Sequence, residues 1–237
     1  MNALTFAFVG IYSYLQLISC DVIIRRPNES NIKEPCALDD LSCIRNEFKK
    51  NGWCSNLSKE QNSRGYLYLN SITSRLPVVN ATVTDTQVTI AGLENGIVSA
   101  FYINLITDAV VLSVDFSDIH YHETATFYYH REGQEDLIVE IPDTTEYYKS
   151  VTTTSTTSGG RKFSPSNTET HARINVKAEY EFPGVEDVTD QDVLAFLAAI
   201  KENEFATIQE LYVPRAPVLA YYYMQNVICD SSHHPNC

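Results

Sequence analysis

Apolar and polar residues alternate with a period of two over most of the middle of this chain. The longest run covers 171–182, where every second residue is apolar. Shorter runs lie at 79–90, 97–105, 110–117, 125–129 and 137–141. Successive side chains of a strand point to opposite faces of a sheet, so the pattern predicts antiparallel strands with one buried face between residues 66 and 182. Turn residues between the runs, such as Asn95-Gly96, predict a meander.

One polar tract interrupts this alternation. Residues 150–170 are dominated by Ser, Thr and Gly. They are interpreted as two solvated strand ends around a flexible loop at Gly159-Gly160. O-glycosylation of the tract is an alternative, but a simple polar hairpin is favoured.

A helical period appears first in the cysteine-rich segment 35–54. Its apolar stripe is formed by Leu41, Ile44 and Phe48. Asp39 or Asp40 is placed to cap the start of this helix, and Asn51-Gly52 is placed to end it. Trp53, the sole Trp of the chain, follows at once and is assigned a packing role.

The helical period returns after Pro183-Gly184, in the segment 187–228. Thr189 or Asp190 can cap a helix there, and the prolines at 214 and 217 are expected to interrupt it before a further apolar helix over 218–228. A sheet with one apolar face needs a cover, which these helices can supply. The predicted fold class is α+β: a long antiparallel β-meander packed on C-terminal helices, with a short N-terminal helix; the resemblance described below implies that the sheet is curved.

The first 20 residues contain no Asp, Glu, Lys or Arg. Such an apolar run is typical of a secretory signal peptide and is too short to span a bilayer comfortably. Its LISC ending also resembles a lipoprotein cleavage box, but the basic residues that normally precede such a box are absent. We therefore predict a signal peptide at 1–20 and a single secreted domain at 21–237, with a tail from 229. Cleavage before or after Cys20 stays open.

The formal net charge of −13 narrows the classes of partner. Such acidity argues against nucleic acid and against an anionic membrane surface. Tyrosine is abundant, with 15 residues. It suits partly wet interfaces, and it equally suits strands, so its abundance alone does not decide between binding and packing.

Five cysteines remain after residue 20: Cys36, Cys43, Cys54, Cys229 and Cys237. An oxidising secretory compartment favours disulfides over metal thiolates. Their spacing contains no C-x-x-C and no histidine at zinc-finger distance, so a zinc site is disfavoured. Five cysteines with one unpaired allow fifteen two-bridge patterns, and spacing does not choose among them.

Three N-x-S/T sequons lie in the first third of the chain. They are candidate glycan sites at Asn28, Asn56 and Asn80. One sequon means little by itself, because chance supplies about one in a chain of this size. Three sequons behind a signal peptide strengthen the interpretation, although some of them can be silent.

The best candidates for chemistry are histidines. On a strand, His120 and His122 would project to the same side, and with His130 they could bind a metal. No acidic or cysteine ligand is obviously placed with them, so exposed or hydrogen-bonded histidines are favoured. His233-His234 are read as tail residues. The sequence has no G-x-S-x-G, P-loop or G-x-G-x-x-G signature, and we predict neither an enzyme nor a cofactor.

Two non-enzymatic classes stay open from the residues alone. In one, the sheet leaves an apolar tunnel around the C-terminal helix for a lipid-like ligand. In the other, the interior is filled and the outer surface binds other proteins, as in a chaperone or an assembly subunit. Both classes predict the same strands.

The order of a signal peptide, early cysteines before a helix, a meander and a C-terminal helix resembles the insect takeout and juvenile-hormone-binding family. That family has a strongly curved sheet around a long helix and encloses a hydrophobic ligand. Several details are closer to the fibrohexamerin (P25) family of lepidopteran silk. They are Cys54, the segment GLENGIVSAFYINLITDAVVL at 92–112, the multiple sequons, and the late Cys229 and Cys237.

The resemblance implies a secreted glycoprotein of the silk gland lumen. Fibrohexamerin associates noncovalently with the fibroin heavy and light chains and helps to keep the heavy chain soluble, so these two chains are the expected partners. The alternative is a takeout-like carrier of a hydrophobic small molecule. Takeout-like chains pair the cysteines that correspond to Cys36 and Cys43. We predict a Cys229–Cys237 bridge in the tail, which leaves Cys54 free beside Trp53; the alternative is that Cys54 pairs with a tail cysteine.

Overall fold

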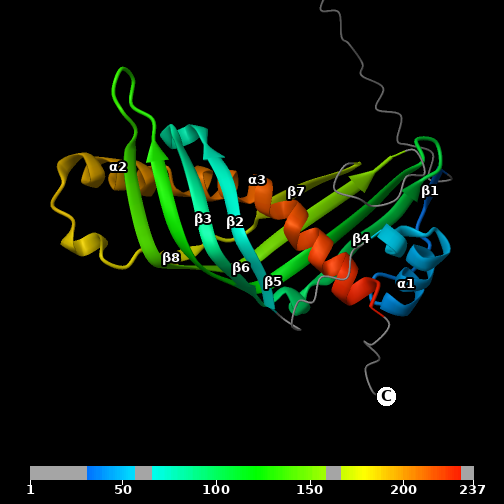
Figure 1. The fold of residues 1–237 in the computed structure, drawn as a ribbon. Helices are drawn as coiled ribbons and strands as arrows, with labels where there is room; N and C mark the ends of the chain where they lie inside the picture. Colours follow the sequence, from blue (N-terminus) through cyan, green and yellow to red (C-terminus); the bar gives the residue numbers. More distant parts are fainter. Residues whose placement is uncertain (1–30, 57–65, 159–166, 231–237) are drawn as a thin grey trace, which may run out of the picture.

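A computed structural model describes residues 31–56, 66–158 and 167–230 of the chain. These residues form one eight-stranded antiparallel sheet that curves around a long C-terminal helix (Figure 1). The strands are β1 (Ile32–Lys33), β2 (Tyr66–Leu76), β3 (Ala81–Ala91), β4 (Ile97–Asn104), β5 (Ala109–Tyr129), β6 (Leu137–Thr157), β7 (Thr168–Ile174) and β8 (Glu179–Glu181). The predicted α+β class is confirmed.

The strand order departs from a simple meander at β5. Strands β5 and β6 are each 21 residues long and pair along their full length. The other edge of β5 holds two shorter strands, with β4 beside Ala109–Asp115 and β3 beside His120–Tyr129. Strand β3 therefore pairs with β5 and not with β4, its neighbour in sequence. The physical reason is length, because β5 is long enough to pair with both.

Residues with positive φ in three adjacent strands accompany the curvature of the sheet, and those in β3 and β6 lie at shifts of register. Gln87 of β3, Asp118 of β5 and Asp143 of β6 have φ of 55°, 56° and 53°. The register of β3 against β5 shifts between Thr86 and Thr89, and that of β5 against β6 shifts near Asp143. A bulge bends its strand and increases its twist, so these irregularities let long strands wrap around a helix.

The predicted strand over 172–182 is broken in the structure. Strand β7 ends at Ile174 opposite Val151, and β8 resumes at Glu179 opposite Tyr147. Four residues, 175–178, thus face three residues of β6, 148–150, and the extra residue cannot stay in the ladder. The alternation of side chains is satisfied on both sides of the break, since Ile174 and Ala178 are both buried. Periodicity alone therefore gave no sign of it.

Helix α1 (Leu41–Lys50) forms where the sequence predicts it. Asp40 is the cap, because its carboxylate accepts a hydrogen bond from the backbone N–H of Cys43 at 2.9 Å. Ile44 and Phe48 are fully buried. Trp53 begins the short 3-10 helix η2 (Trp53–Asn56) and packs edge-on against Phe48, with ring centroids 5.1 Å apart.

The C-terminal helices are α2 (Gln191–Glu202), capped by Asp190, and α3 (Glu204–Tyr223), which continues into the π-helical turn η6 (Met224–Ile228). The predicted interruption at Pro214 and Pro217 is wrong, since both prolines lie inside α3. The break falls at Asn203 instead. Each proline removes only one N–H donor, and burial of the helix against the sheet outweighs that loss. Among the described residues, no helix is long and apolar enough to cross a membrane.

Two disulfides link the described cysteines. Cys36 pairs with Cys43, the pairing that the resemblance implies, and Cys54 pairs with Cys229. The predicted Cys229–Cys237 bridge is therefore wrong, because Cys229 is already bonded; Cys237 lies outside the described residues. The reason is spatial, since the end of η6 lies against α1 and η2 at one end of the molecule (Figure 1). Cys54 therefore lies close to Cys229, although the two residues are far apart in the sequence.

Candidate functional site

Four charged side chains meet in the interior between the sheet and α3. The Arg215 guanidinium of α3 lies 2.9 Å from Asp85 of β3, 2.8 Å from Glu123 of β5 and 2.5 Å from Glu146 of β6. Each of these side chains is at most 7% exposed. One arginine thus links the helix to three strands. We call these four residues the central cluster.

Tyrosines surround the central cluster. The Tyr121 ring lies 4.6 Å from the Arg215 guanidinium, and the Tyr148 hydroxyl donates a hydrogen bond of 2.6 Å to Glu146. Tyr212 packs edge-on against Tyr121 and Tyr148, at centroid distances of 6.1 and 4.8 Å. Side chains therefore fill this part of the space between the sheet and α3. An enclosed cavity beside the cluster has a volume of about 20 Å³.

Burial controls the protonation of the cluster. Desolvation raises the pKa of Glu123 to about 9, although the charge of Arg215 opposes the shift. Desolvation also raises the pKa of Asp85. Glu123 Oε2 and Arg215 Nε have no hydrogen-bond partner among the described residues. The raised pKa of Glu123 favours its protonated form, which reduces the excess of negative charge around the single arginine.

The central cluster is closed to solvent, so its chemistry is structural: it fixes the position of α3 against three strands. Sequence reasoning missed it, although the sequence contains a signal. Glu123 occupies a position on the apolar face of an alternating strand, between Tyr121 and Ala125. Arg215 is the one charged residue between Leu211 and Met224 of an otherwise apolar helix. Opposite charges at core positions of two elements indicate a buried ion pair.

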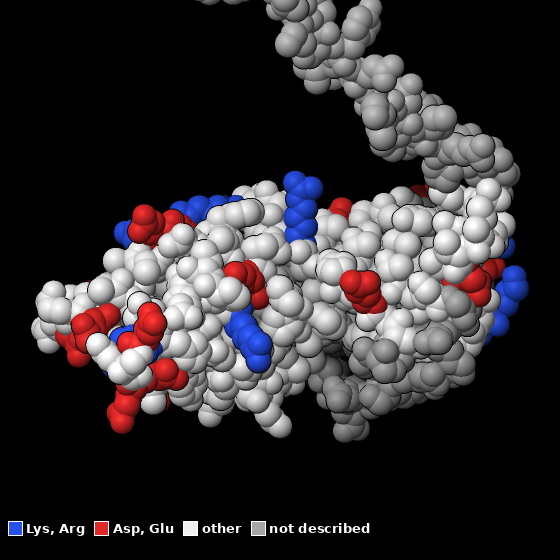
Figure 2. Space-filling view, turned by 90° about the horizontal axis from the view of Figure 1, so that it is seen from above, with Lys and Arg blue, Asp and Glu red and all other residues white. Residues whose placement is uncertain are grey.

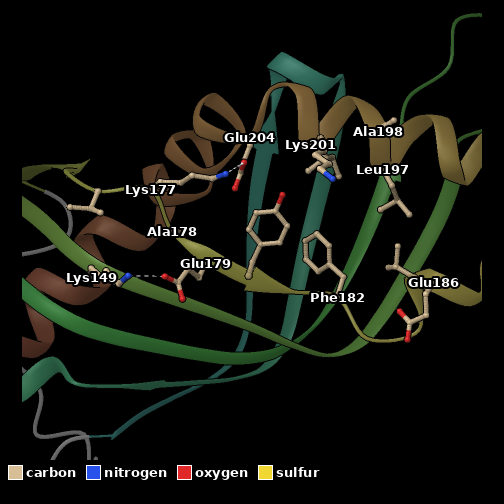
Figure 3. A pocket seen from close by; sticks show the side chains of 14 residues that line it. Lys149, Lys177, Ala178, Glu179, Phe182, Glu186, Leu197, Ala198, Lys201 and Glu204 are labelled. Atoms are coloured by element: carbon tan, nitrogen blue, oxygen red, sulfur yellow. Dashed lines mark hydrogen bonds and ion pairs between the residues drawn. The ribbon is translucent and has the colours of Figure 1, made fainter.

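A groove of about 1010 Å³ lies outside this core, between residues 176–186 and the helices α2 and α3 (Figure 3). Its apolar lining consists of Val176, Ala178, Tyr180, Phe182, Val185, Leu197, Ala198 and Ile200. Two ion pairs of 2.7 Å lie along it, Lys149–Glu179 and Lys177–Glu204. Lys201 also lines the groove and has no acidic partner among the described residues. We call this feature the α2 groove.

The structure does not bring the three candidate histidines together. His120 and His122 are exposed on β5, where His120 stacks on Tyr147 at 4.6 Å and His122 lies 3.9 Å from Asp143. His130 is part of a separate network, with contacts of 3.0 Å to both Thr82 and Asp136. Within the described ranges, no three His, Cys, Asp or Glu side chains are grouped to hold a metal ion. His233-His234 lie outside those ranges.

The three sequons fall in different parts of the chain. Asn28 lies outside the described residues, and Asn56 ends η2. Asn80 is exposed in the turn between β2 and β3, where its φ of 51° is left-handed. Its side-chain Nδ2 donates a hydrogen bond of 2.6 Å to the His130 carbonyl. Asn80 is thus exposed to solvent, with its side-chain amide engaged in the turn.

The curved sheet and its long helix define the class of protein. The crystal structure of Takeout 1 from Epiphyas postvittana has the same fold, with a TM-score of 0.52 and 12% sequence identity. The match covers 86% of this chain and 97% of Takeout 1. The chain is therefore a Takeout-like protein in its fold.

The sequence itself matches a narrower group. The Fibroin P25 family model matches residues 32–232, so the chain belongs to the Fibroin P25 family. Fibrohexamerin of Galleria mellonella is 24% identical over 205 residues, which cover 85% of this chain and 89% of that protein. The predicted resemblance to the fibrohexamerin family is confirmed.

Proposed function

We propose that this chain is a secreted, non-enzymatic glycoprotein subunit of a silk fibroin complex. It binds the fibroin heavy and light chains noncovalently and aids their solubility, transport and secretion. The observation that carries the proposal is the match of the Fibroin P25 family model over residues 32–232. The similarity to the fibrohexamerin of Galleria mellonella supports it.

The surface of the molecule has the physical properties that such a task requires. A net charge of −13 makes copies of the chain repel each other, which opposes aggregation. Charged side chains are sparse over the middle of the face in Figure 2, and acidic ones gather at the end that carries α2. Ile97, Ile106, Phe205 and Val213 are each more than half exposed. Uncharged and apolar surface of this kind can contact a hydrophobic partner.

Co-expression with the two fibroin chains tests the proposal. The chain is secreted from insect cells with the heavy and light chains, or with an unrelated acidic secreted protein as the control. We expect it to elute with the disulfide-linked heavy and light chains, and detergent without a reducing agent should release it. Recovery of a free monomer alone, in the presence of both fibroin chains, would contradict the proposal.

A carrier of a hydrophobic small molecule is the second candidate. The Takeout-like fold and the α2 groove of about 1010 Å³ favour it, because the apolar lining can shield an acyl chain or a ring system from water. Native mass spectrometry of the secreted protein, before and after organic extraction, measures any bound molecule. A single mass that extraction leaves unchanged would count against this candidate.

A further inference from the structure

We propose that the α2 groove binds an extended segment of a partner polypeptide, one that carries apolar side chains and a carboxylate. The inference rests on the proposed function, because it takes the partner to be a chain of the fibroin complex. Three properties of the groove support it: an open strand edge, an apolar lining and an unpaired lysine.

The groove lies along the chain segment between β7 and β8 and reaches the start of β8. Consecutive residues from Val176 to Tyr180 all line it. Residues 176–178 belong to the irregular segment between β7 and β8, and Glu179 and Tyr180 begin β8, so the groove reaches the edge of this short strand. Strand β8 pairs with β6 alone among the described strands. Its second edge therefore presents backbone N–H and C=O groups that an added strand can pair with.

The lining and the shape favour a peptide over a compact small molecule. Apolar side chains come from both sides of the groove, from 176–185 and from α2 (Figure 3). Val176 is 44% exposed and packs in neither hydrophobic cluster of the core, so it is available to a partner. Small-molecule sites typically enclose most of their ligand. This groove is open to solvent and, at about 1010 Å³, has the volume of several side chains, which suits an extended segment.

The charged side chains of the groove indicate one further property of the partner segment. Lys149 and Lys177 are already paired with glutamates, whereas the Lys201 ammonium is unpaired and lies beside the apolar lining (Figure 3). A carboxylate on the partner would complete the pairing of the three lysines. The net charge of −13 repels a strongly acidic partner. The segment that fits best is therefore mostly uncharged, with one acidic residue among apolar ones.

Two groove variants and a matched control test this inference in the co-expressed fibroin complex. Lys201→Glu reverses the unpaired charge, and Val176→Glu places a charge in the apolar lining. Lys49→Glu makes the same charge change on exposed α1, at the opposite end of the molecule (Figure 1). We expect each groove variant to reduce the amount of the chain retained in the fibroin complex by about tenfold, as for a contact at the centre of an interface. The control should change this amount less than twofold. Thermal unfolding of the free variants verifies that they fold.

Photo-crosslinking identifies what occupies the groove. A photoreactive amino acid at position 176 should crosslink to an extended fibroin segment, and the same amino acid at position 49 should not. If the unmodified chain joins the complex and both groove variants join it equally well, the inference is overturned while the proposed function stands. If the unmodified chain does not join the complex, the proposed function fails and the inference fails with it. Crosslinking of position 176 to a small amphiphile alone also overturns the inference.

Discussion

Cys54 is bonded to Cys229 with Cα atoms 5.5 Å apart, although 175 positions separate them in the sequence. The bridge joins η2 to the end of η6. Arg45 of α1 strengthens the same junction, since its Nε and Nη2 donate hydrogen bonds of 2.7 and 3.0 Å to the carbonyls of Ile228 and Val227. Carbonyls at the end of a helix lack intrahelical donors, so these bonds stabilise the end of the long helix.

The length of the closed loop predicts how much each disulfide stabilises the fold. Chain entropy gives about 5 kcal/mol for the Cys54–Cys229 loop and about 2.5 kcal/mol for the short Cys36–Cys43 loop, both as upper values. We expect the Cys54→Ser/Cys229→Ser variant to lose more free energy of unfolding than the Cys36→Ser/Cys43→Ser variant. Urea unfolding, monitored by the fluorescence of Trp53, measures the loss in both variants. Equal losses of unfolding free energy would show that loop length does not determine how much each bridge stabilises the fold.

The central cluster predicts a large loss of stability when Arg215 is replaced. Replacing Arg215 by Met leaves buried carboxyl groups of three strands without a counter-charge, which typically costs about 3–5 kcal/mol. The control is Arg131→Met, because the Arg131–Asp192 pair of 3.0 Å is partly exposed and should contribute about 1 kcal/mol or less. Chemical denaturation of both variants provides the comparison. A similar small loss for both would mean that the carboxyl groups adapt by taking up protons.

These predictions depend on features that the sequence reveals unevenly. Local rules succeeded where the signal is local: Asp40 and Asp190 cap the helices that they were expected to cap, and the alternation located the strands of the sheet. The α+β fold class follows from these elements, because a sheet with one apolar face must be covered, whereas the curvature of the sheet is implied only by the family resemblance. This part of the structure is encoded in short stretches of residues.

Long-range features were not predictable in the same way. The partner of Cys54 depends on where η6 ends relative to α1, which no spacing reports. The break between β7 and β8 arises from a one-residue excess against β6, so it depends on register and not on composition. The α2 groove needs the placement of Lys201 beside 176–180, two segments from different elements. Charged residues at positions on an otherwise apolar face of a strand or helix predict only one of these long-range features, the central cluster.

The raised pKa of Glu123 predicts that the fold is less stable in alkaline solution. Its pKa is about 9 in the folded state and near 4.5 in the unfolded state, so the folded state binds the extra proton between these values. The contribution of Glu123 is fully present below pH 4.5 and is lost as the pH rises toward 9. The slope is at most about 1.4 kcal/mol per pH unit. The raised pKa of Asp85 acts with the same sign.

The variant Glu123→Gln isolates this effect. Glutamine keeps an oxygen that can accept from Arg215 but does not titrate. We expect the free energy of unfolding of the variant to fall less than that of the unmodified chain between pH 5.5 and 8.5. Urea unfolding at four pH values measures the difference. Parallel pH profiles for the two proteins would rule out Glu123 as the titrating group.

Gly92 is a position where a single methyl group should be costly. Its φ is +88°, and an added Cβ would lie 2.2 Å from the carbonyl oxygen of Asp118, which itself has a positive φ of 56°. Gly92→Ala combines left-handed strain of about 1–2 kcal/mol with a steric clash that adds about 1–3 kcal/mol. Gly133→Ala is the control, since its φ is +69° and nothing lies within 4 Å of the added atom. Thermal unfolding should show the larger loss at Gly92, and equal losses would exclude the clash.

The sequon at Asn80 offers a test of glycosylation that leaves the asparagine in place. Asn80 has a left-handed φ, so replacing it would also strain the turn. Thr82→Val removes the hydroxyl that the sequon requires, whereas Thr82→Ser retains it, along with a donor for the contact to His130. We expect Thr82→Val to lower the intact mass of the protein secreted from insect cells by one glycan, and Thr82→Ser to leave the glycan in place. Enzymatic removal of N-glycans should abolish the difference. If Thr82→Val lowers the mass by no more than the substitution itself, Asn80 does not carry a glycan.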